Sequence, residues 1–186
     1  ADYTKGNRFH SPGNLSTMPK IRLIGNLLLS FASKMSSGYW RIFDPTNGFT
    51  AIHGKVLKEL PLDKISKDYF FESDMLFRLN ITRAVICDIP MKAIYADETS
   101  NLKISKILMP FARKHIVNFF KRITYNYFIR DFSIASIELV ASILLILFGV
   151  FFGSQEWLIS SQTGVPATAG TVIIAALPIL VGSQLF

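Results

Sequence analysis

The chain has 186 residues, of which 50% are hydrophobic, and a formal net charge of +7. Its single cysteine, Cys87, excludes a disulfide framework or a cysteine metal site within the chain, and its three histidines lack the spacing of zinc ligands. All 20 lysines and arginines lie at or before Arg130, and residues 131–186 contain none. This asymmetry predicts a basic, water-facing part and a part suited to lipid, so anionic lipid is a better expected partner than nucleic acid.

The basic part begins with a predicted strand and helix. Residues 2–9 are typical of a strand that ends in a glycine-containing loop, and a loop rich in Ser, Pro, Gly and Asn follows at 10–17. A helix is predicted next, because Pro19 suits a first helical turn and apolar residues recur at helical spacing between Ile21 and Met35. We expect this helix to end over residues 36–38, where serines and a glycine follow one another.

The middle of the chain alternates turns, helices and strands. A dense turn signal, Asp-Pro-Thr-Asn-Gly, occupies residues 44–48. From there the patterns predict helices over 51–60 and 69–83, strands over 84–89 and 91–95, and a polar loop over 96–102. Apolar and basic residues then alternate with helical periodicity over 104–130, which predicts one or two amphipathic helices along a membrane surface.

The last part of the chain holds two apolar stretches, residues 132–153 and 167–186, each near the roughly 20 residues that span a hydrocarbon core about 30 Å thick. We predict a transmembrane hairpin with a polar connector over 154–166, the second span still apolar where the sequence stops. A buried helical hairpin of a soluble protein is the alternative. Basic residues precede the first stretch and none lies in the connector, so the positive-inside rule places residues 1–130 in the cytoplasm.

Two groups of cationic and polar residues could hold a phosphate. Lys5, Asn7 and Arg8 surround a glycine, which permits close approach to the backbone, and a guanidinium is a planar fork matched to phosphate oxygens. Arg22 and Asn26 are four residues apart and therefore share a helix face. The alternatives are a solvated loop for the first group and the ordinary polar face of an amphipathic helix for the second.

Acidic residues mark two further segments. Asp44 and Asn47 can hydrogen-bond the local backbone and, with Gly48, shape a sharp turn. Glu72 and Asp74 stand in an apolar context, a setting typical of a general acid or base. Because residues two apart do not share a helix face, we expect at most one of this pair to point into a site. The alternative role for both is stabilisation of a helix N-terminus.

Five segments, in this order, resemble the membrane-bound family 2 glycosyltransferases, in particular the polyprenyl-phosphate glycosyltransferases related to dolichol-phosphate mannosyltransferase. The resemblance covers essentially all of the chain. The first three are DYTKGNRF, similar to the family's strand with glycine, arginine and an aromatic residue at its end; IRLIGNLLL, similar to its next helix; and DPTNGFTAI, similar to its Asp and Gly-Phe turn. The last two are FFESDMLFRL, similar to its acidic helix start, and IPMKAIYADETSNLK, similar to the strand and loop that lead to its membrane helices.

The resemblance implies an α/β fold class: the C-terminal half of a GT-A (Rossmann-like) domain over 1–102, amphipathic juxtamembrane helices over 103–130, and the transmembrane hairpin over 131–186. It implies a multi-pass enzyme of the cell (inner) membrane that moves a sugar from a nucleotide-sugar donor to a polyprenyl phosphate at the cytoplasmic face. A missing N-terminal half would hold Mg²⁺ or Mn²⁺ through an Asp-x-Asp motif, with no metal on the residues here. We therefore expect these 186 residues to be inactive alone. The resemblance leaves open whether the enzyme forms a homo-oligomer.

The resemblance also implies roles for residues. Glu72 or Asp74 would lie near the sugar or the acceptor, and neutralisation of phosphate charge is the main electrostatic demand of such a transfer. The residues implied for phosphate or acceptor binding are Lys5, Asn7, Arg8, Arg22, Asn26 and Ser100.

One segment departs from the mannosyltransferase pattern. Residues 95–101 lack its arginine and Gly-x-Ser-Lys run, and only Ser100 and Lys103 have counterparts there, so mannose specificity does not follow. The Asp-Glu pair that this chain has at residues 97–98 is more similar to the sequence of bacterial enzymes of surface polysaccharide synthesis. Two alternatives stay open: a family 2 enzyme that uses a hydroxyl acceptor, with Asp74 as its base, and a non-catalytic membrane-anchoring module.

Overall fold

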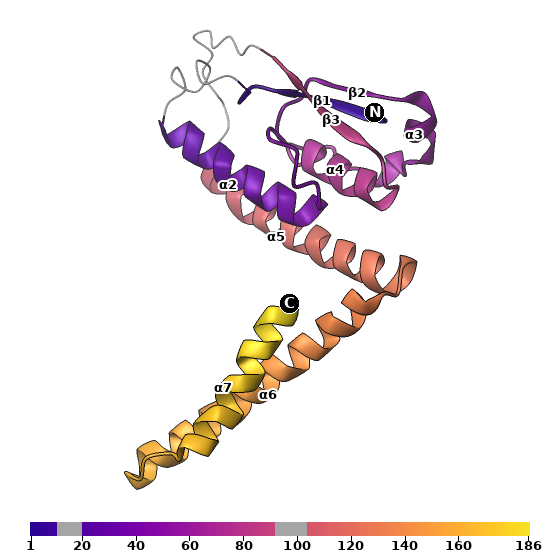
Figure 1. Ribbon diagram of the computed structural model, residues 1–186. Coiled ribbons are helices and arrows are strands. Elements are labelled where there is room, and N and C mark those ends of the chain that lie inside the picture. The colour runs from indigo at the N-terminus through magenta and orange to yellow at the C-terminus, as the bar shows by residue number, and fades with distance from the viewer. Residues whose placement is uncertain (11–19, 92–103) are drawn as a thin grey trace. The chain divides into compact units, whose positions relative to one another are not determined.

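The computed structural model describes residues 1–10, 20–91 and 104–186, with side chains described for 1–10, 23–91 and 108–186. The chain forms two compact units (Figure 1). Unit 1 comprises Ala1–Asn126, and unit 2 comprises Tyr127–Phe186.

Unit 1 contains a three-stranded sheet of order β2-β1-β3, formed by β1 (Tyr3–Asn7), β2 (Thr50–Ile52) and β3 (Ile86–Pro90). The central strand β1 is antiparallel to β2 and parallel to β3. The strands predicted over 2–9 and 84–89 are thus confirmed, and the mixed sheet with its helices confirms an α/β chain. The strand predicted over 91–95 lies outside the described residues, apart from Met91.

The helix predicted over 51–60 was wrong at its start. Residues 50–52 form strand β2, and only α3 (Gly54–Glu59) is helical. The reason is tertiary, because Thr50 to Ile52 pair with β1, a partner far away in the sequence. His53, whose Nδ1 accepts a hydrogen bond from the backbone N–H of Lys55 at 3.3 Å, caps the shorter helix.

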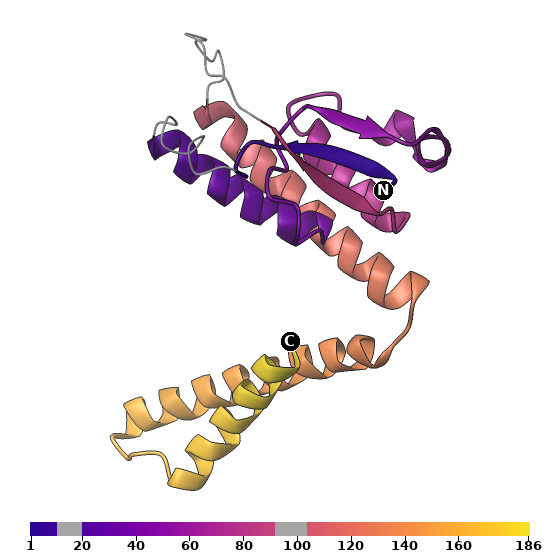
Figure 2. The ribbon, with the colours of Figure 1, turned by 45° about the horizontal axis from the view of Figure 1, so that its top comes forward.

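Helices α2 (Lys20–Ser37), α4 (Phe71–Ile81) and α5 (Ile104–Thr124) make up the rest of unit 1, with a 3₁₀ turn at Leu62–Lys64. They confirm the helices predicted between 19 and 35, over 69–83 and within 104–130. Helix α2 ends at Gly38, whose φ of 81° is a left-handed conformation that favours glycine. Helices α2 and α5 lie side by side, and both contact α4 (Figures 1 and 2).

The core of unit 1 lies between α4 and the sheet. One face of α4 contributes Met75, Leu76 and Leu79, which pack with Tyr3 of β1. Leu60, Ile65 and Ala84 complete this buried cluster. It holds α4 firmly against β1, so the first turn of α4 lies beside the loops that follow the strands.

Helix α5 buries two polar residues and exposes several large apolar ones. His115 and Asn118 are buried against α2 and α4, whereas Leu108, Met109 and Phe120 are 62–77% exposed. Helix α2 likewise exposes four large apolar side chains, Ile24, Leu27, Leu28 and Phe31. After Thr124 the backbone continues as a π-helical segment over Tyr125–Arg130.

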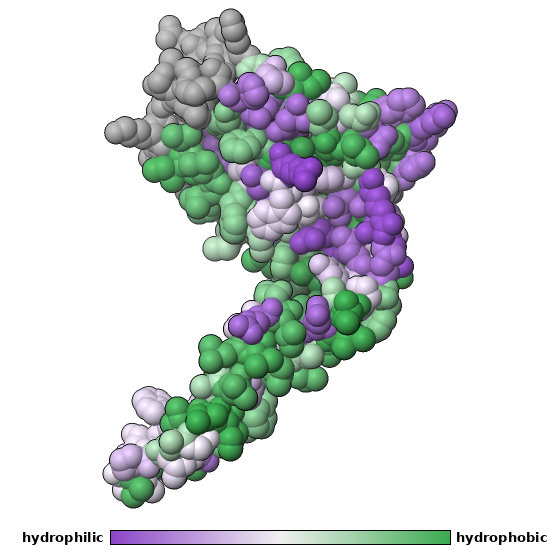
Figure 3. Space-filling view, viewed as in Figure 1, coloured by the Kyte–Doolittle hydropathy of each residue, from purple (hydrophilic) through white to green (hydrophobic). Residues whose placement is uncertain are grey.

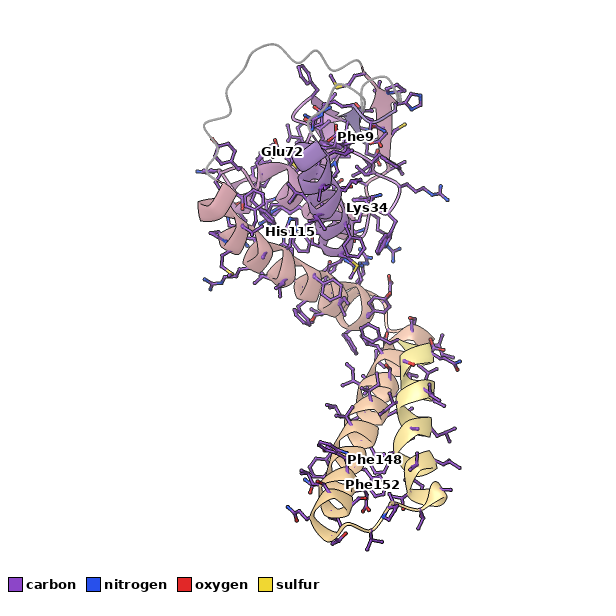
Figure 4. All side chains as sticks on the ribbon, turned by 90° about the vertical axis from the view of Figure 1, so that its left-hand side faces the viewer. Phe9, Lys34, Glu72, His115, Phe148 and Phe152 are labelled. Carbon is purple, nitrogen blue, oxygen red and sulfur yellow. The ribbon has the colours of Figure 1, made fainter. Side chains whose placement is uncertain are left out.

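Unit 2 consists of α6 (Ile134–Thr163) and α7 (Ala169–Leu185), which pack against each other. The contact depends on small residues: a Cβ added to Gly149 would lie 2.7 Å from the carbonyl oxygen of Ala175, and Ser142 donates a hydrogen bond to the carbonyl oxygen of Gly182 at 2.8 Å. The rings of Phe148 and Phe152 stack on α6 (Figure 4).

The polar connector predicted over 154–166 was wrong for its first ten residues, which are helical. Polarity did not end the helix, because Ser160 and Thr163 direct their hydroxyls to nearby carbonyl oxygens. The helix ends instead at Gly164, which is left-handed with φ 69°, two residues before Pro166.

Within the described ranges, one helix, α6, is long and apolar enough to cross a membrane, judged by its length and composition. Only 17% of the 18-residue apolar segment that meets this criterion is buried. Figure 3 shows a mostly hydrophobic surface over unit 2. Helix α7 has 17 residues and is shorter than that criterion requires, so the second predicted span stays a prediction.

Candidate functional site

Most of the residues singled out in the sequence meet at the carboxyl ends of β1 and β3. We call this group the Lys5–Arg8 cluster. Strands β1 and β3 run in parallel, so their last residues share one edge of the sheet, and the turn over 44–48 closes over that edge. The members of the cluster are Lys5, Asn7, Arg8, Asp44, Asn47, Glu72 and Asp88.

An ion pair between Arg8 and Asp44 ties the end of β1 to the turn. The Nε of Arg8 lies 2.6 Å from one carboxylate oxygen of Asp44, and a terminal nitrogen lies 2.9 Å from the other. The backbone N–H of Arg8 also donates to this carboxylate, at 3.2 Å. The Asp44 side chain is fully buried, whereas that of Arg8 is 26% exposed. A phosphate would therefore meet the exposed edge of a guanidinium that is already fixed in place.

Lys5 is buried beneath this pair, with only 1% of its surface exposed. Its ammonium donates a hydrogen bond to the carbonyl oxygen of Asn47. Burial lowers the pKa of Lys5 to about 8, against the opposing attraction of Glu72, Asp44 and Asp88. Lys5 thus supplies positive charge to the interior of the cluster and does not reach solvent.

The amides of Asn7 and Asn47 fix the backbone of the cluster. Asn47 donates to the carbonyl oxygen of Gly6 at 2.8 Å and accepts from the N–H of Phe49 at 3.0 Å. Asn7 accepts from the N–H of Phe9 at 2.9 Å. A Cβ at Gly6 would lie 2.4 Å from the sulfur of Met91 and 2.8 Å from the amide nitrogen of Asn47. The space beside Gly6 is therefore filled by the protein's own side chains.

Asp88 is a member of the cluster that sequence reasoning missed. One of its oxygens accepts hydrogen bonds from the N–H of Phe43 at 2.9 Å and from Asn7 at 3.2 Å. Within the described part of the chain, its other oxygen is buried without a hydrogen-bond partner. Burial raises the pKa of Asp88, and the nearby Asp44 raises it further. The signal that could have identified it was a carboxylate inside an apolar strand.

Glu72 and Asp74 point to different surroundings, as expected for residues two apart on a helix. Glu72 lies 3.7 Å from the position of a Cβ on Gly48 and interacts electrostatically with Lys5, which places it in the cluster (Figure 4). Asp74 is buried on the α5 side of α4 instead. Its carboxylate accepts from the N–H of Ser66 at 2.9 Å, from Asn118 at 3.1 Å and from Arg78 at 3.2 Å. Three donors hold it as a structural acceptor outside the cluster.

The remaining predicted residues are only partly placed. Asn26 lies on α2, one turn before Ser30, whose hydroxyl donates to the carbonyl oxygen of Phe43 at 3.1 Å. This bond attaches α2 to the same turn that closes the cluster. The side chain of Arg22 and the whole of Ser100 lie outside the described residues.

No group of three or more His, Cys, Asp or Glu side chains in the described ranges is arranged to hold a metal ion. The three carboxylates of the cluster face two cations of the protein, Lys5 and Arg8. The cluster can bind an anionic group at Arg8 and accept hydrogen bonds from ligand hydroxyls at Glu72, which is partly exposed.

Comparison with known proteins identifies a relative among the glycosyltransferases. No family model matches the chain, and no solved structure matches it. The chain is 30% identical over 96 residues to the UDP-N-acetylglucosamine–dolichyl-phosphate N-acetylglucosaminyltransferase of Methanococcus voltae. The aligned part is 52% of this chain and 38% of that protein, so the chain spans well under half the length of this relative. The similarity relates the chain to a glycosyltransferase.

Proposed function

We propose that this chain is the acceptor-side, membrane-attached part of a family 2 glycosyltransferase of GT-A type. The enzyme transfers a sugar from a nucleotide-sugar to a polyprenyl phosphate at the cytoplasmic membrane face. The observation that carries this proposal is the 30% identity to an enzyme whose name states a dolichyl phosphate acceptor and a UDP-sugar donor. The Lys5–Arg8 cluster supports it, because it places a fixed, partly exposed guanidinium and a partly exposed carboxylate around Lys5.

Membrane attachment is supported by the apolar surfaces of both units. Helix α6 has the length and composition of a membrane span, and we propose α7 as a second span. In unit 1, the outward apolar residues of α2 and α5 suit an interfacial position, with α2 exposing Leu28 at 67% and α5 exposing Met109 at 77%. The cations that precede residue 131 would then face the cytoplasm.

In the proposed reaction, Arg8 binds a phosphate and its ion pair with Asp44 keeps the guanidinium in one orientation. Glu72 accepts hydrogen bonds from hydroxyls of the sugar or the acceptor. A phosphate acceptor is already anionic and requires no general base. Mg²⁺ or Mn²⁺ would be held by residues beyond this chain.

The position of Asp74 favours the phosphate acceptor over the hydroxyl acceptor. A hydroxyl acceptor requires a base, and Asp74 is 4% exposed with three hydrogen-bond donors on its carboxylate. We therefore expect Asp74→Asn to keep most of the transfer activity with polyprenyl phosphate. A loss of transfer in a variant that still folds would favour the hydroxyl-acceptor enzyme.

The test is a transfer assay with the complete gene product in native membranes, using radiolabelled nucleotide-sugars and polyprenyl phosphate. We expect transfer by the parent protein and a loss of about 100-fold or more in kcat/KM for Arg8→Lys, which keeps the charge but loses the fork. Lys58→Arg, on exposed α3, is the matched control. If no nucleotide-sugar supports transfer, while the protein still binds anionic vesicles in a salt-sensitive manner, the chain is a membrane-anchoring module instead.

A further inference from the structure

A second group of cations lies between α4 and α5, away from the Lys5–Arg8 cluster. It lines an open groove with a volume of about 510 Å³. Facing rows form its walls: Phe70, the N-cap of α4, is followed at four-residue intervals by Asp74 and Arg78 of that helix, and a stripe from Met109 to Lys121 follows α5. We call it the α4–α5 pocket.

The lining of the α4–α5 pocket carries an excess of positive charge. Its ionisable side chains are five cations and one carboxylate, that of Asp74. The carboxylate already accepts hydrogen bonds from Ser66, Arg78 and Asn118. The five cations are Lys64, Arg78, Arg113, Lys114 and Lys121. This charge distribution favours an anion.

Three of these cations, Lys64, Arg113 and Lys121, have no ion pair within the described part of the chain. Arg78 pairs with Asp74 at 3.2 Å, and Lys114 pairs with Asp68 at 2.5 Å. Arg113 and Lys121 form no ion pair and no hydrogen bond within the described part of the chain, and both are exposed. They are two turns apart on α5 and flank Val117, so both can contact one ligand.

Apolar side chains also line the pocket. Met109, Pro110 and Val117 form part of its wall, and Phe120 is 62% exposed on the same helix. Nine residues, 125–133, separate α5 from the apolar helix α6 in the sequence. A phospholipid would satisfy both groups. Its phosphate would contact the cations, and its acyl chains would contact these apolar side chains.

We propose that the α4–α5 pocket binds the phosphate group of an anionic phospholipid headgroup. Arg113 and Lys121 contact the phosphate, and Met109 and Val117 contact the start of the acyl chains. The site is separate from the Lys5–Arg8 cluster and requires no sugar transfer, so it does not depend on the proposed function.

Native mass spectrometry of the full chain in an uncharged detergent tests this site with added phosphatidylglycerol or phosphatidylcholine. We expect phosphatidylglycerol to bind more tightly, and Arg113→Gln/Lys121→Gln to weaken it by about tenfold or more, since each basic residue near anionic lipid contributes about a factor of five. Lys55→Gln/Lys58→Gln, on exposed α3, removes the same charge outside the pocket and should leave binding within about twofold. Equal weakening by both double variants would overturn the proposal, because the binding would then follow net charge alone.

A second pair of variants adds a charge and removes none. Val117→Glu places a carboxylate in the pocket wall and should abolish preferential binding, whereas Ile116→Glu, the exposed neighbour outside the lining, should not. Titration with inorganic phosphate separates the two sources of the ligand. Phosphate that displaces the lipid at similar concentrations would overturn the lipid assignment and leave a site for free phosphate. Retention of binding by folded Val117→Glu would overturn the site itself.

Discussion

The Lys5–Arg8 cluster and the α4–α5 pocket both gather cations, but the fold uses them differently. In the cluster, two cations face Asp44, Glu72 and Asp88, and Lys5 is buried. In the pocket, five cations line a cavity with one carboxylate, and Arg113 and Lys121 are exposed. The two sites therefore differ in how far the protein itself pairs its cations. The cluster holds Arg8 in one orientation through its ion pair, whereas Arg113 and Lys121 at the pocket have no ion pair within the described ranges.

The local structure explains this difference. Strand ends and a tight turn bring short polar side chains into contact, and buried charges there must be paired at folding. Two helices side by side present long side chains whose stems cover the surface while their charged ends stay in water, so pairing is not required. The cluster should therefore be sensitive to substitution, and the rim of the pocket should tolerate it.

The largest expected effect is that of Asp44→Ala in the cluster. The variant removes a fully buried carboxylate and leaves Arg8 and its backbone N–H without this acceptor. Loss of one partner of a buried pair costs about 3–5 kcal/mol, which should lower Tm by about 10 °C or more. Thermal unfolding of the chain in mild detergent, monitored by near-UV circular dichroism, measures this change in Tm.

Asp63→Ala is the matched control for this substitution, since Asp63 is exposed in the 3₁₀ turn. We expect its Tm to stay within about 2 °C of the parent, as surface substitutions usually do. Similar Tm values for the two variants would mean that the ion pair of Arg8 and Asp44 does not stabilise the cluster.

Acid should destabilise unit 1 through His115, whose ring contacts that of Phe70, a residue that lines the pocket. Burial lowers the pKa of His115 from 6.5 to about 4, and its Nδ1 lies 2.8 Å from the hydroxyl of Ser36. The unfolded chain takes up a proton near pH 6.5 and the folded chain only near pH 4. Stability is therefore complete above pH 6.5 and falls by roughly 3 kcal/mol as the pH falls through this range.

Melting curves between pH 7 and pH 4.5 measure this dependence, and the informative quantity is the slope of Tm against pH. His115→Gln should flatten the slope even if it lowers Tm throughout. His10→Gln, at an exposed histidine, should retain the parent's slope. An unchanged slope in His115→Gln would show that other groups cause the acid sensitivity.

A smaller loss of stability is expected for Gly6→Ala, because the cluster has no space beside this residue. The new Cβ would lie 2.8 Å from the amide nitrogen of Asn47 and 2.4 Å from the sulfur of Met91. Overpacking of this kind costs about 1–3 kcal/mol, and the flexible methionine places the value at the lower end. Gly54→Ala, where no atom lies within 4 Å, is the control. Chemical denaturation should also show partial recovery in Gly6→Ala/Met91→Ala, and no recovery would contradict the proposed clash.

The sequence predicted the parts of this molecule that depend on local pattern. Spacing of apolar residues identified α2 and α4, and the rule that residues two apart diverge on a helix anticipated the separation of Glu72 from Asp74. It missed β2, which exists because it pairs with β1, and Asp88, which joins the cluster only when β3 aligns with β1. Nor could it predict the α4–α5 pocket, since its walls come from segments about 40 residues apart.

The smallest effect on stability is expected for substitutions at the rim of the pocket. Arg113→Gln/Lys121→Gln removes two exposed cations that form no ion pair within the described ranges, so the free energy of unfolding should change by about 0.5 kcal/mol or less. We expect this change to be a slight gain in stability, because like charges along the pocket wall repel each other. Chemical denaturation at low and high salt checks this, since salt should reduce the gain. A loss of about 2 kcal/mol would show that these cations hold the fold together, and the contrast with the cluster would disappear.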